Sequence, residues 1–210
     1  MILLSSPRTI FNAGMLFHLI IATVAVISIL LLKGIKFFSF QSIAHLTTSL
    51  LIGAGIGLCF QICYRSISQR FSWTSKMDSH LAVHFEGMVL GEIFFLALIS
   101  SISEELLFRA LIQPYLGLWL TSFLFGLAHW TGKRELLVWP FLAFFAGLML
   151  GELSEQPVIG VTGATSAHFI INFLGLSHLS KARQNSALKT FSSDENPIPD
   201  PTSPREIEDR

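Results

Sequence analysis

The sequence predicts an all-α membrane protein, a bundle of about six transmembrane helices with a polar site inside the bundle. Hydrophobic residues make up 51% of the 210 residues and charged residues only 13%, whereas soluble domains carry roughly a quarter charged residues. The apolar residues gather in stretches close to the roughly 20 residues that a helix needs to cross a bilayer. The formal net charge is zero, so no basic excess indicates a nucleic-acid partner. The predicted partner is the lipid bilayer.

Six apolar stretches define the predicted spans in chain order. They cover residues 15–32, 43–64, 88–112, 116–131, 136–153 and 158–179. The second contains Gly53 and Gly57 in GxxxG spacing, which permits close contact between helices inside a bundle. We expect the spans to form one transmembrane helical domain over residues 1–180, with a motif-bearing core over 88–180.

The segments outside the spans have a different composition. Between the second and third spans, basic residues are mixed with Phe71 and Trp73, which suits a segment lying at the lipid headgroups. From about Lys181 the chain becomes Pro-rich and charged, without apolar periodicity. This composition predicts a disordered polar tail over residues 181–210.

The distribution of Lys and Arg predicts that both termini are cytoplasmic. With the N-terminus inside, the outer segments hold only Lys33 and Lys36, as the positive-inside rule requires. The inner segments then hold the remaining basic residues near the spans, which are Arg8, Arg65, Arg70, Lys76, Lys133, Arg134, Lys181, Arg183 and Lys189.

Three charged residues interrupt the third span. Glu105 and Arg109 are four residues apart, so they share one face of a helix and can neutralise each other. Glu104 is turned about 100° away, which leaves its carboxylate without a local cationic partner and suited to proton transfer. We interpret Glu105 and Arg109 as a structural ion pair before any catalytic role.

Two further polar clusters lie at membrane depth. His129 ends the fourth span, with Phe125 one turn before it, and His168 and Asn172 share one face of the last span. Either residue type can serve simply as a hydrogen-bond partner between helices, and that alternative stays open for each taken alone. Because neither suits a lipid-facing position, we expect all three polar side chains to point into the bundle.

The depths of these groups permit a single site. At 1.5 Å per residue from an outer boundary near Ile112, Tyr115 and Val158, Glu104 lies about 12 Å deep, His168 about 15 Å and His129 about 21 Å. All three therefore fall near the middle of the membrane.

The three clusters together resemble the motif set of the CAAX-protease and bacteriocin-processing family (CPBP, or Abi) of intramembrane proteases. The family shows Glu-Glu-x-x-x-Arg, then Phe-x-x-x-His, then His-x-x-x-Asn or Asp on successive helices. Here these are Glu104-Glu105-Leu106-Leu107-Phe108-Arg109, Phe125-Gly126-Leu127-Ala128-His129 and His168-Phe169-Ile170-Ile171-Asn172. Order and spacing agree over roughly residues 88–180.

The resemblance implies an intramembrane endopeptidase acting on a membrane-associated protein or peptide. By resemblance, Glu104 is the general base, His129 holds or polarises the attacking water, and His168 and Asn172 stabilise the oxyanion. Glu105 and Arg109 would support the orientation of Glu104.

The resemblance leaves the cofactor open between two mechanisms. Zinc held by Glu104, His129 and His168 is one reading. A water activated by glutamate without metal uses the same residues, and we favour it because Asn172 is a poor zinc ligand and a natural oxyanion donor.

Other readings concern function and location. The leading alternative is a non-catalytic membrane scaffold or bacteriocin-immunity protein of the same family. The chain is short for a prenyl-protein endopeptidase, which leaves a prenylated CAAX substrate open. We expect an integral protein of a bacterial inner (plasma) membrane. The predicted topology puts Glu104 nearer the outer face, whereas the CAAX enzymes work from the cytosolic side.

Overall fold

The structure, a computed structural model, describes residues 6–38 and 42–194, with side chains up to Lys181 apart from Ser75. Over these residues it is all-α, which confirms the predicted fold class. The helices are α1 (Pro7–Lys33), α2 (Ile43–Ser68), α3 (Ser72–Phe85), α4 (Leu90–Glu105), α5 (Gln113–Ala128), α6 (Val138–Glu155) and α7 (Gly160–Asp194). Short 3₁₀ turns, η1 (Ile35–Phe38) and η3 (Arg134–Leu136), and a π-helical segment, η2 (Leu106–Ile112), complete the order.

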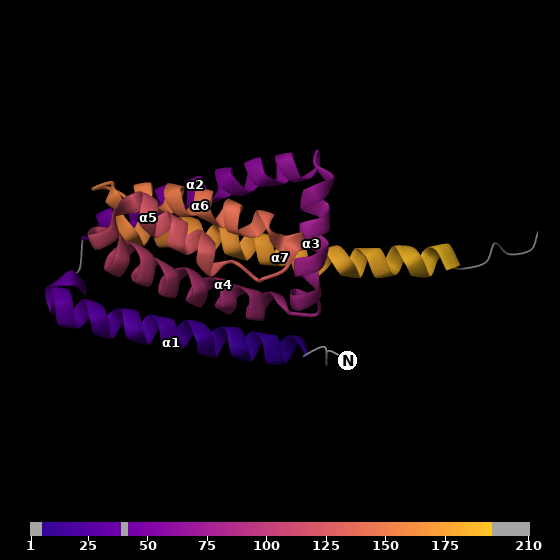
Figure 1. Cartoon of the computed structure of the whole chain (residues 1–210), viewed down its shortest axis with the longest axis horizontal. Helices are drawn as coiled ribbons and strands as arrows, with labels where there is room; N and C mark the ends of the chain where they lie inside the picture. Colours follow the sequence, from indigo (N-terminus) through magenta and orange to yellow (C-terminus); the bar gives the residue numbers. More distant parts are fainter. Residues whose placement is uncertain (1–5, 39–41, 195–210) are drawn as a thin grey trace, which may run out of the picture.

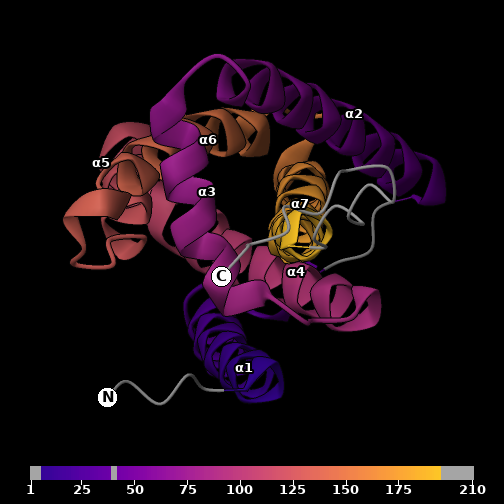
Figure 2. The same ribbon diagram turned by 90° about the vertical axis from the view of Figure 1, so that its right-hand side faces the viewer.

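Helix α7 forms the centre of the bundle. It packs against α2, α3, α4 and α6, and Figure 2 shows it between α2 on one side and α4 on the other. The contact with α2 uses small residues on both helices: a Cβ at Gly53 would lie 2.0 Å from the Gly163 carbonyl oxygen, and one at Gly57 would lie 2.4 Å from that of Ala167. The GxxxG spacing in α2 thus brings two helix backbones together, next to His168.

A chain reversal at Gly117 places the predicted third and fourth spans side by side. Gly117 has φ 71° and ψ 171°, a left-handed φ that only glycine adopts without strain. The chain from Leu90 ends there and returns along α5. Glu104 and His129 lie at nearly equal distances along the chain from this turn, so the reversal brings them to a similar depth in the bundle.

Helix α3 lies across one end of the bundle. It makes an angle of 106° with the segment Leu90–Ala128, and Figure 1 shows the start of α1, α3 and the far end of α7 at this same end. The Tyr64 hydroxyl at the end of α2 donates to Asp78 of α3 (2.9 Å), and α3 also contacts η3. This helix of 14 residues belongs to the segment for which the sequence predicts a position at the headgroups.

Basic residues lie at both ends of the bundle. Arg65, Lys76 and Arg134 belong to the segments gathered at the α3 end. Lys33 lies at the opposite end, where its Nζ donates to the Ala110 carbonyl oxygen (2.6 Å).

Three helical segments among the described residues are long and apolar enough to cross a membrane. They are Pro7–Lys33, Ile43–Ser68 and Arg134–Glu155, and a fourth is added if the bent pair of α3 and Leu90–Ala128 is one span. Helix α7 is not among them. Its polar residues His168 and Asn172 contact Glu105 and Ser100 of α4, as the sequence predicts for side chains that point into the bundle.

The end of the transmembrane domain differs from the sequence prediction. Helix α7 continues to Asp194, so residues 181–194 are helical where we predicted the start of a disordered tail. Lys181, Ala182 and Arg183 are good helix formers that continue the preceding helix. The rest of the predicted tail, 195–210, lies outside the described residues.

Candidate active site

The paired glutamates lie where α4 changes to π-helix. Glu105 is the last residue of α4, and η2 begins at Leu106 and contains Arg109. Single π-helical turns inside α-helices are frequent at functional sites. The wider turn here follows the glutamates directly, so it sets how Arg109 and the following residues face the rest of the bundle.

Glu105 is the centre of a buried polar chain. Its side chain is 0% exposed; Oε2 accepts from Arg109 Nε (3.2 Å) and Oε1 lies 2.8 Å from His168 Nδ1. Arg109 also donates from Nη1 to Gln113 Oε1 (3.2 Å), and Gln113 Nε2 donates to Glu155 Oε1 (2.7 Å). The predicted ion pair thus also joins η2 to α7 and α6, through His168 and Gln113.

Glu104 is surrounded by three imidazoles, one of which, His168, also contacts Glu105. Its Oε2 lies 3.9 Å from His129 Nε2 and 3.8 Å from His168 Nε2, and its Oε1 lies 3.8 Å from His18 Nδ1. Oε2 is buried and has no hydrogen-bond partner among the described residues. A buried carboxylate oxygen without a partner is costly in a folded protein, and it is well placed to accept a proton.

Hydrogen bonds at Nδ1 determine how the rings of His129 and His168 are oriented. His129 Nδ1 lies 2.8 Å from the Phe125 carbonyl oxygen, which can only accept, so Nδ1 carries the proton. His168 Nδ1 is held by Glu105 in the same way. Both rings therefore present Nε2 to Glu104.

Asn172 is held beside this group rather than on Glu104. Its Nδ2 donates to Ser100 Oγ of α4 (3.0 Å). The same residue lines the cavity described next, together with His129 and His168. Of the predicted site residues, Glu104, His129 and His168 converge directly, and Asn172 joins them at the cavity wall.

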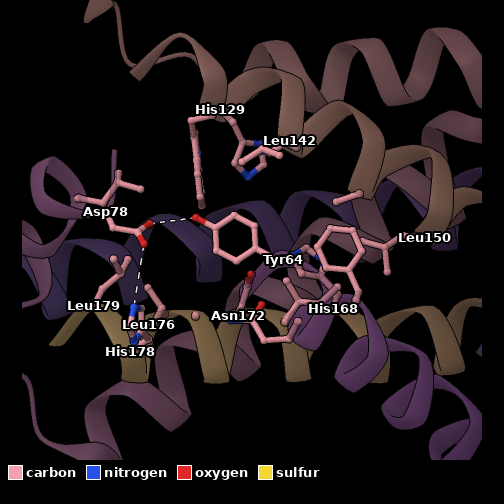
Figure 3. Close-up of a pocket in the computed structure, with 18 of the residues that line it drawn as sticks. Tyr64, Asp78, His129, Leu142, Leu150, His168, Asn172, Leu176, His178 and Leu179 are labelled. Carbon is pink, nitrogen blue, oxygen red and sulfur yellow. Dashed lines mark hydrogen bonds and ion pairs between the residues drawn. The ribbon is translucent and has the colours of Figure 1, made fainter. Parts of the chain in front are cut away.

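A cavity of about 130 Å³ connects the histidines with the α3 end of the bundle. Figure 3 shows His129, His168 and Asn172 in its wall with Tyr64, Asp78 and His178. The remaining lining is mainly apolar: Phe60, Leu81, Phe125, Trp139, Leu142, Ala143, Ala146, Leu150, Ile171, Leu176 and Leu179. Glu104 is not part of the lining and meets the cavity only through the two histidines.

Asp78 is the acidic group near the α3 end of the cavity. Burial raises the pKa of its carboxyl, while the hydrogen bond from Tyr64 acts in the opposite direction. His178 Nε2 lies 4.0 Å from the second carboxylate oxygen. These contacts tie α3 to α2 and α7 at the cavity.

Sequence reasoning missed His18, Tyr64 and Asp78. His18 received no role because it has no partner nearby in the sequence, yet it lies within the apolar first span, where an ionisable residue is by default a functional candidate. Tyr64 and Asp78 carried no recognisable signal, since their contact depends on how α3 folds back over α2.

The donor atoms around Glu104 are further apart than the ligands of a zinc ion. The donor types of Glu104, His129 and His168 suit zinc, but tetrahedral ligands at 2.0–2.1 Å from the metal lie roughly 3.3 Å apart. The separations from Oε2 to the two Nε2 atoms are 3.8 and 3.9 Å, and no three metal-ligating side chains of the described residues converge closely enough to hold an ion. The arrangement does not fit zinc as it stands.

Comparison with known proteins supports the resemblance inferred from the motifs. Residues 86–174 match the family described as "Type II CAAX prenyl endopeptidase Rce1-like". The chain is also similar to the uncharacterized protein YpbD of Bacillus subtilis (strain 168), with 32% identity over 91 residues, which is 42% of this chain and 46% of that protein. The match thus spans about half of the length of this curated relative. No solved structure matches the chain.

The matched segment contains all the converging residues except His18. It begins one residue after the end of α3 and ends two residues after Asn172. Over residues 86–174 the chain is therefore similar to the Rce1-like family of CAAX-type proteases.

Proposed function

We propose that this protein is an intramembrane endopeptidase that hydrolyses a peptide bond of a membrane-associated protein or peptide. One observation carries the proposal. The buried Oε2 of Glu104 has no hydrogen-bond partner among the described residues and faces the Nε2 atoms of two cavity-lining histidines at 3.8 and 3.9 Å. These separations are too long for direct hydrogen bonds, and a water molecule in contact with all three atoms would be correctly placed for activation.

In this mechanism Glu104 acts as the general base. It removes a proton from the water while the oxygen attacks the carbonyl carbon of the scissile bond. His129 accepts the water's second hydrogen bond through its unprotonated Nε2, which orients the attacking oxygen. Glu104 then transfers the proton to the leaving nitrogen as the C–N bond breaks, giving a carboxylic acid and an amine. General acid–base steps of this kind contribute about 10²–10⁴-fold to a rate.

His168 and Asn172 are the proposed donors to the oxyanion. His168 donates from Nε2 only when both of its ring nitrogens are protonated, and the Glu105 carboxylate at Nδ1 (2.8 Å) compensates that positive charge. Asn172 has one N–H engaged with Ser100 and a second available to the cavity. Donors held rigidly in a site that excludes water stabilise developing charge by several kcal/mol.

The cavity suggests the direction of substrate entry. It runs from the histidines towards α3, which lies at the basic end of the bundle. By the positive-inside rule this end is cytoplasmic, so a substrate would reach the site from that face of a bacterial inner membrane. Access from the cytoplasmic side agrees with how CAAX enzymes work, although Glu104 itself is closer in sequence to the opposite end of its helix. The apolar lining suits an apolar peptide segment.

The alternative of a non-catalytic scaffold or immunity protein is less favoured. A scaffold needs the Glu105–Arg109 pair to hold its helices, but it does not need an unpartnered carboxylate oxygen facing two oriented imidazoles.

Cleavage of membrane-anchored peptides by the detergent-purified protein tests the proposal. Glu104→Gln should lower kcat by at least about 10²-fold, and His129→Ala should do the same through loss of water orientation. Glu152→Gln is the matched control, because it makes the same change at an exposed carboxylate of α6 and should leave kcat unchanged.

Two further arms complete the design. Activity should survive a strong zinc chelator if the glutamate acts without metal, and chelator-sensitive activity restored by zinc would overturn that part of the mechanism. Equal cleavage by wild type and Glu104→Gln would identify a contaminant and reject the assignment. If the folded wild type cleaves no peptide, the scaffold function gains support.

A further inference from the structure

We propose that His18 of α1 is a positioning residue for Glu104, and that α1 is therefore part of the catalytic unit. The inference rests on the proposed function and deepens it. His18 lies outside the segment 86–174 that matches the family. Its contact with Glu104 would therefore add a residue of the N-terminal helix to the site.

Helix α1 packs against the helical segments that carry the site. It packs on α4 and η2, and Lys33 at its far end donates to the Ala110 carbonyl oxygen of η2. Much of the remaining α1 surface is apolar and exposed, including Leu16, Phe17, Leu19 and Ile20, as expected for a face towards lipid. His18 interrupts this apolar sequence and turns inward, with 13% of its side chain exposed.

The contacts of His18 determine which of its atoms faces Glu104. Its Nδ1 lies 3.0 Å from Ser103 Oγ and 3.8 Å from Glu104 Oε1. The Ser103 hydroxyl donates its own proton to the Ser100 carbonyl oxygen (3.0 Å), so Oγ accepts from His18 and Nδ1 carries a proton. An N–H donor is thus anchored on Ser103 directly beside the carboxylate.

The two oxygens of Glu104 thereby have separate environments. Oε1 lies 3.8 Å from Nδ1 of His18, whose N–H donates to Ser103, whereas Oε2 faces His129 and His168 at the cavity wall. His18 restricts rotation of the carboxylate and leaves Oε2 as the oxygen that receives the proton from water. At 3.8 Å this contact is too long for a direct hydrogen bond, so His18 acts on the carboxylate through the position and polarity of its ring. Second-layer contacts that orient a site residue typically contribute about 10–100-fold to activity.

A hydrophobic contact alone does not explain a histidine here. An ionisable side chain within an apolar helix is unfavourable in a membrane unless it is paired. The polar side-chain partners described for His18 are Ser103 and Glu104, and both belong to the turn of α4 that carries the proposed base.

The test compares steady-state cleavage by four variants of the full chain in detergent. His18→Leu removes the donor and should lower kcat about 10–100-fold with KM within twofold. His18→Asn retains an N–H near the position of Nδ1 and should recover most of kcat. Ser103→Ala removes the anchor and should lower kcat in the same direction. Thr23→Val changes an exposed residue on the same helix and should behave as wild type.

The possible outcomes separate this inference from the proposed function. If Glu104→Gln is inactive but folded His18→Leu and Ser103→Ala match wild type, His18 has no positioning role while the protease assignment stands. If Glu104→Gln retains full activity, the proposed function itself fails. If His18→Leu does not fold, the other two variants test the inference. An unchanged kcat for Ser103→Ala overturns it. A kcat for His18→Asn as low as that of Glu104→Gln also overturns it.

Discussion

The packing of α2 on α7 gives a sharp prediction for Gly53→Ala. A Cβ at this position would lie 2.0 Å from the Gly163 carbonyl oxygen and within 3.0 Å of two further backbone atoms of Gly163, whereas ordinary contact begins at 3.4 Å. Backbone atoms cannot rotate away, so the two helices must separate by about 1.4 Å, the difference between those distances. Overpacking of this kind costs about 1–3 kcal/mol.

Gly55→Ala provides the matched control. It makes the same change in the same helix, but nothing lies within 4 Å of the added Cβ. Both variants gain the roughly 0.5–1 kcal/mol by which Ala favours a helix over Gly. This gain cancels when the variants are compared, so Gly53→Ala should be less stable than Gly55→Ala by the overpacking term of about 1–3 kcal/mol.

The assay is unfolding of the purified variants in mixed micelles with increasing denaturing detergent. Peptide cleavage should fall with the same variant, because Ala167 and His168 follow the displaced turn of α7. Equal stability of the two variants would refute the close backbone contact between α2 and α7. Loss of stability in Gly55→Ala alone would reverse the assignment of the faces of α2.

The remaining predictions concern buried charge. Glu105→Gln leaves Arg109 buried without a counter-charge and should destabilise the bundle by about 3–5 kcal/mol. Adding Arg109→Met should recover part of that lost stability. A double variant whose loss of stability equals the sum of the losses of the two single variants would contradict the pairing. Asp78→Asn tests the partly buried carboxyl of α3 by thermal unfolding across a pH series. Because burial raises the pKa of Asp78 above its ordinary value of 3.8, the stability linked to its protonated form is present below that value and is lost as pH rises through the folded pKa. The stability of Asp78→Asn relative to wild type should therefore increase as pH rises above about 3.8 and then level off; a difference that is independent of pH would reject the effect of burial on Asp78.

The sequence alone was sufficient for features that depend on neighbouring residues in one helix. Glu105 and Arg109 form the predicted pair because residues four apart share a helix face. The same logic separated Glu104 from that pair before any partner was known. The fold class also followed from composition and apolar stretches, because a membrane-spanning chain must satisfy its backbone hydrogen bonds within helices.

Only the tertiary structure decided which side chains meet around Glu104. The convergence of Glu104 with His129 depends on the reversal at Gly117, and that with His168 depends on the depth at which α7 packs against α2. The sequence did not indicate His18 as a site residue, because its contact with Ser103 of α4 joins residues that are 85 positions apart. The position of the cavity likewise depends on α3 lying across the end of the bundle. Helical periodicity determines the face of a residue on its own helix, but the relative rotation and depth of different helices arise from packing of the whole bundle.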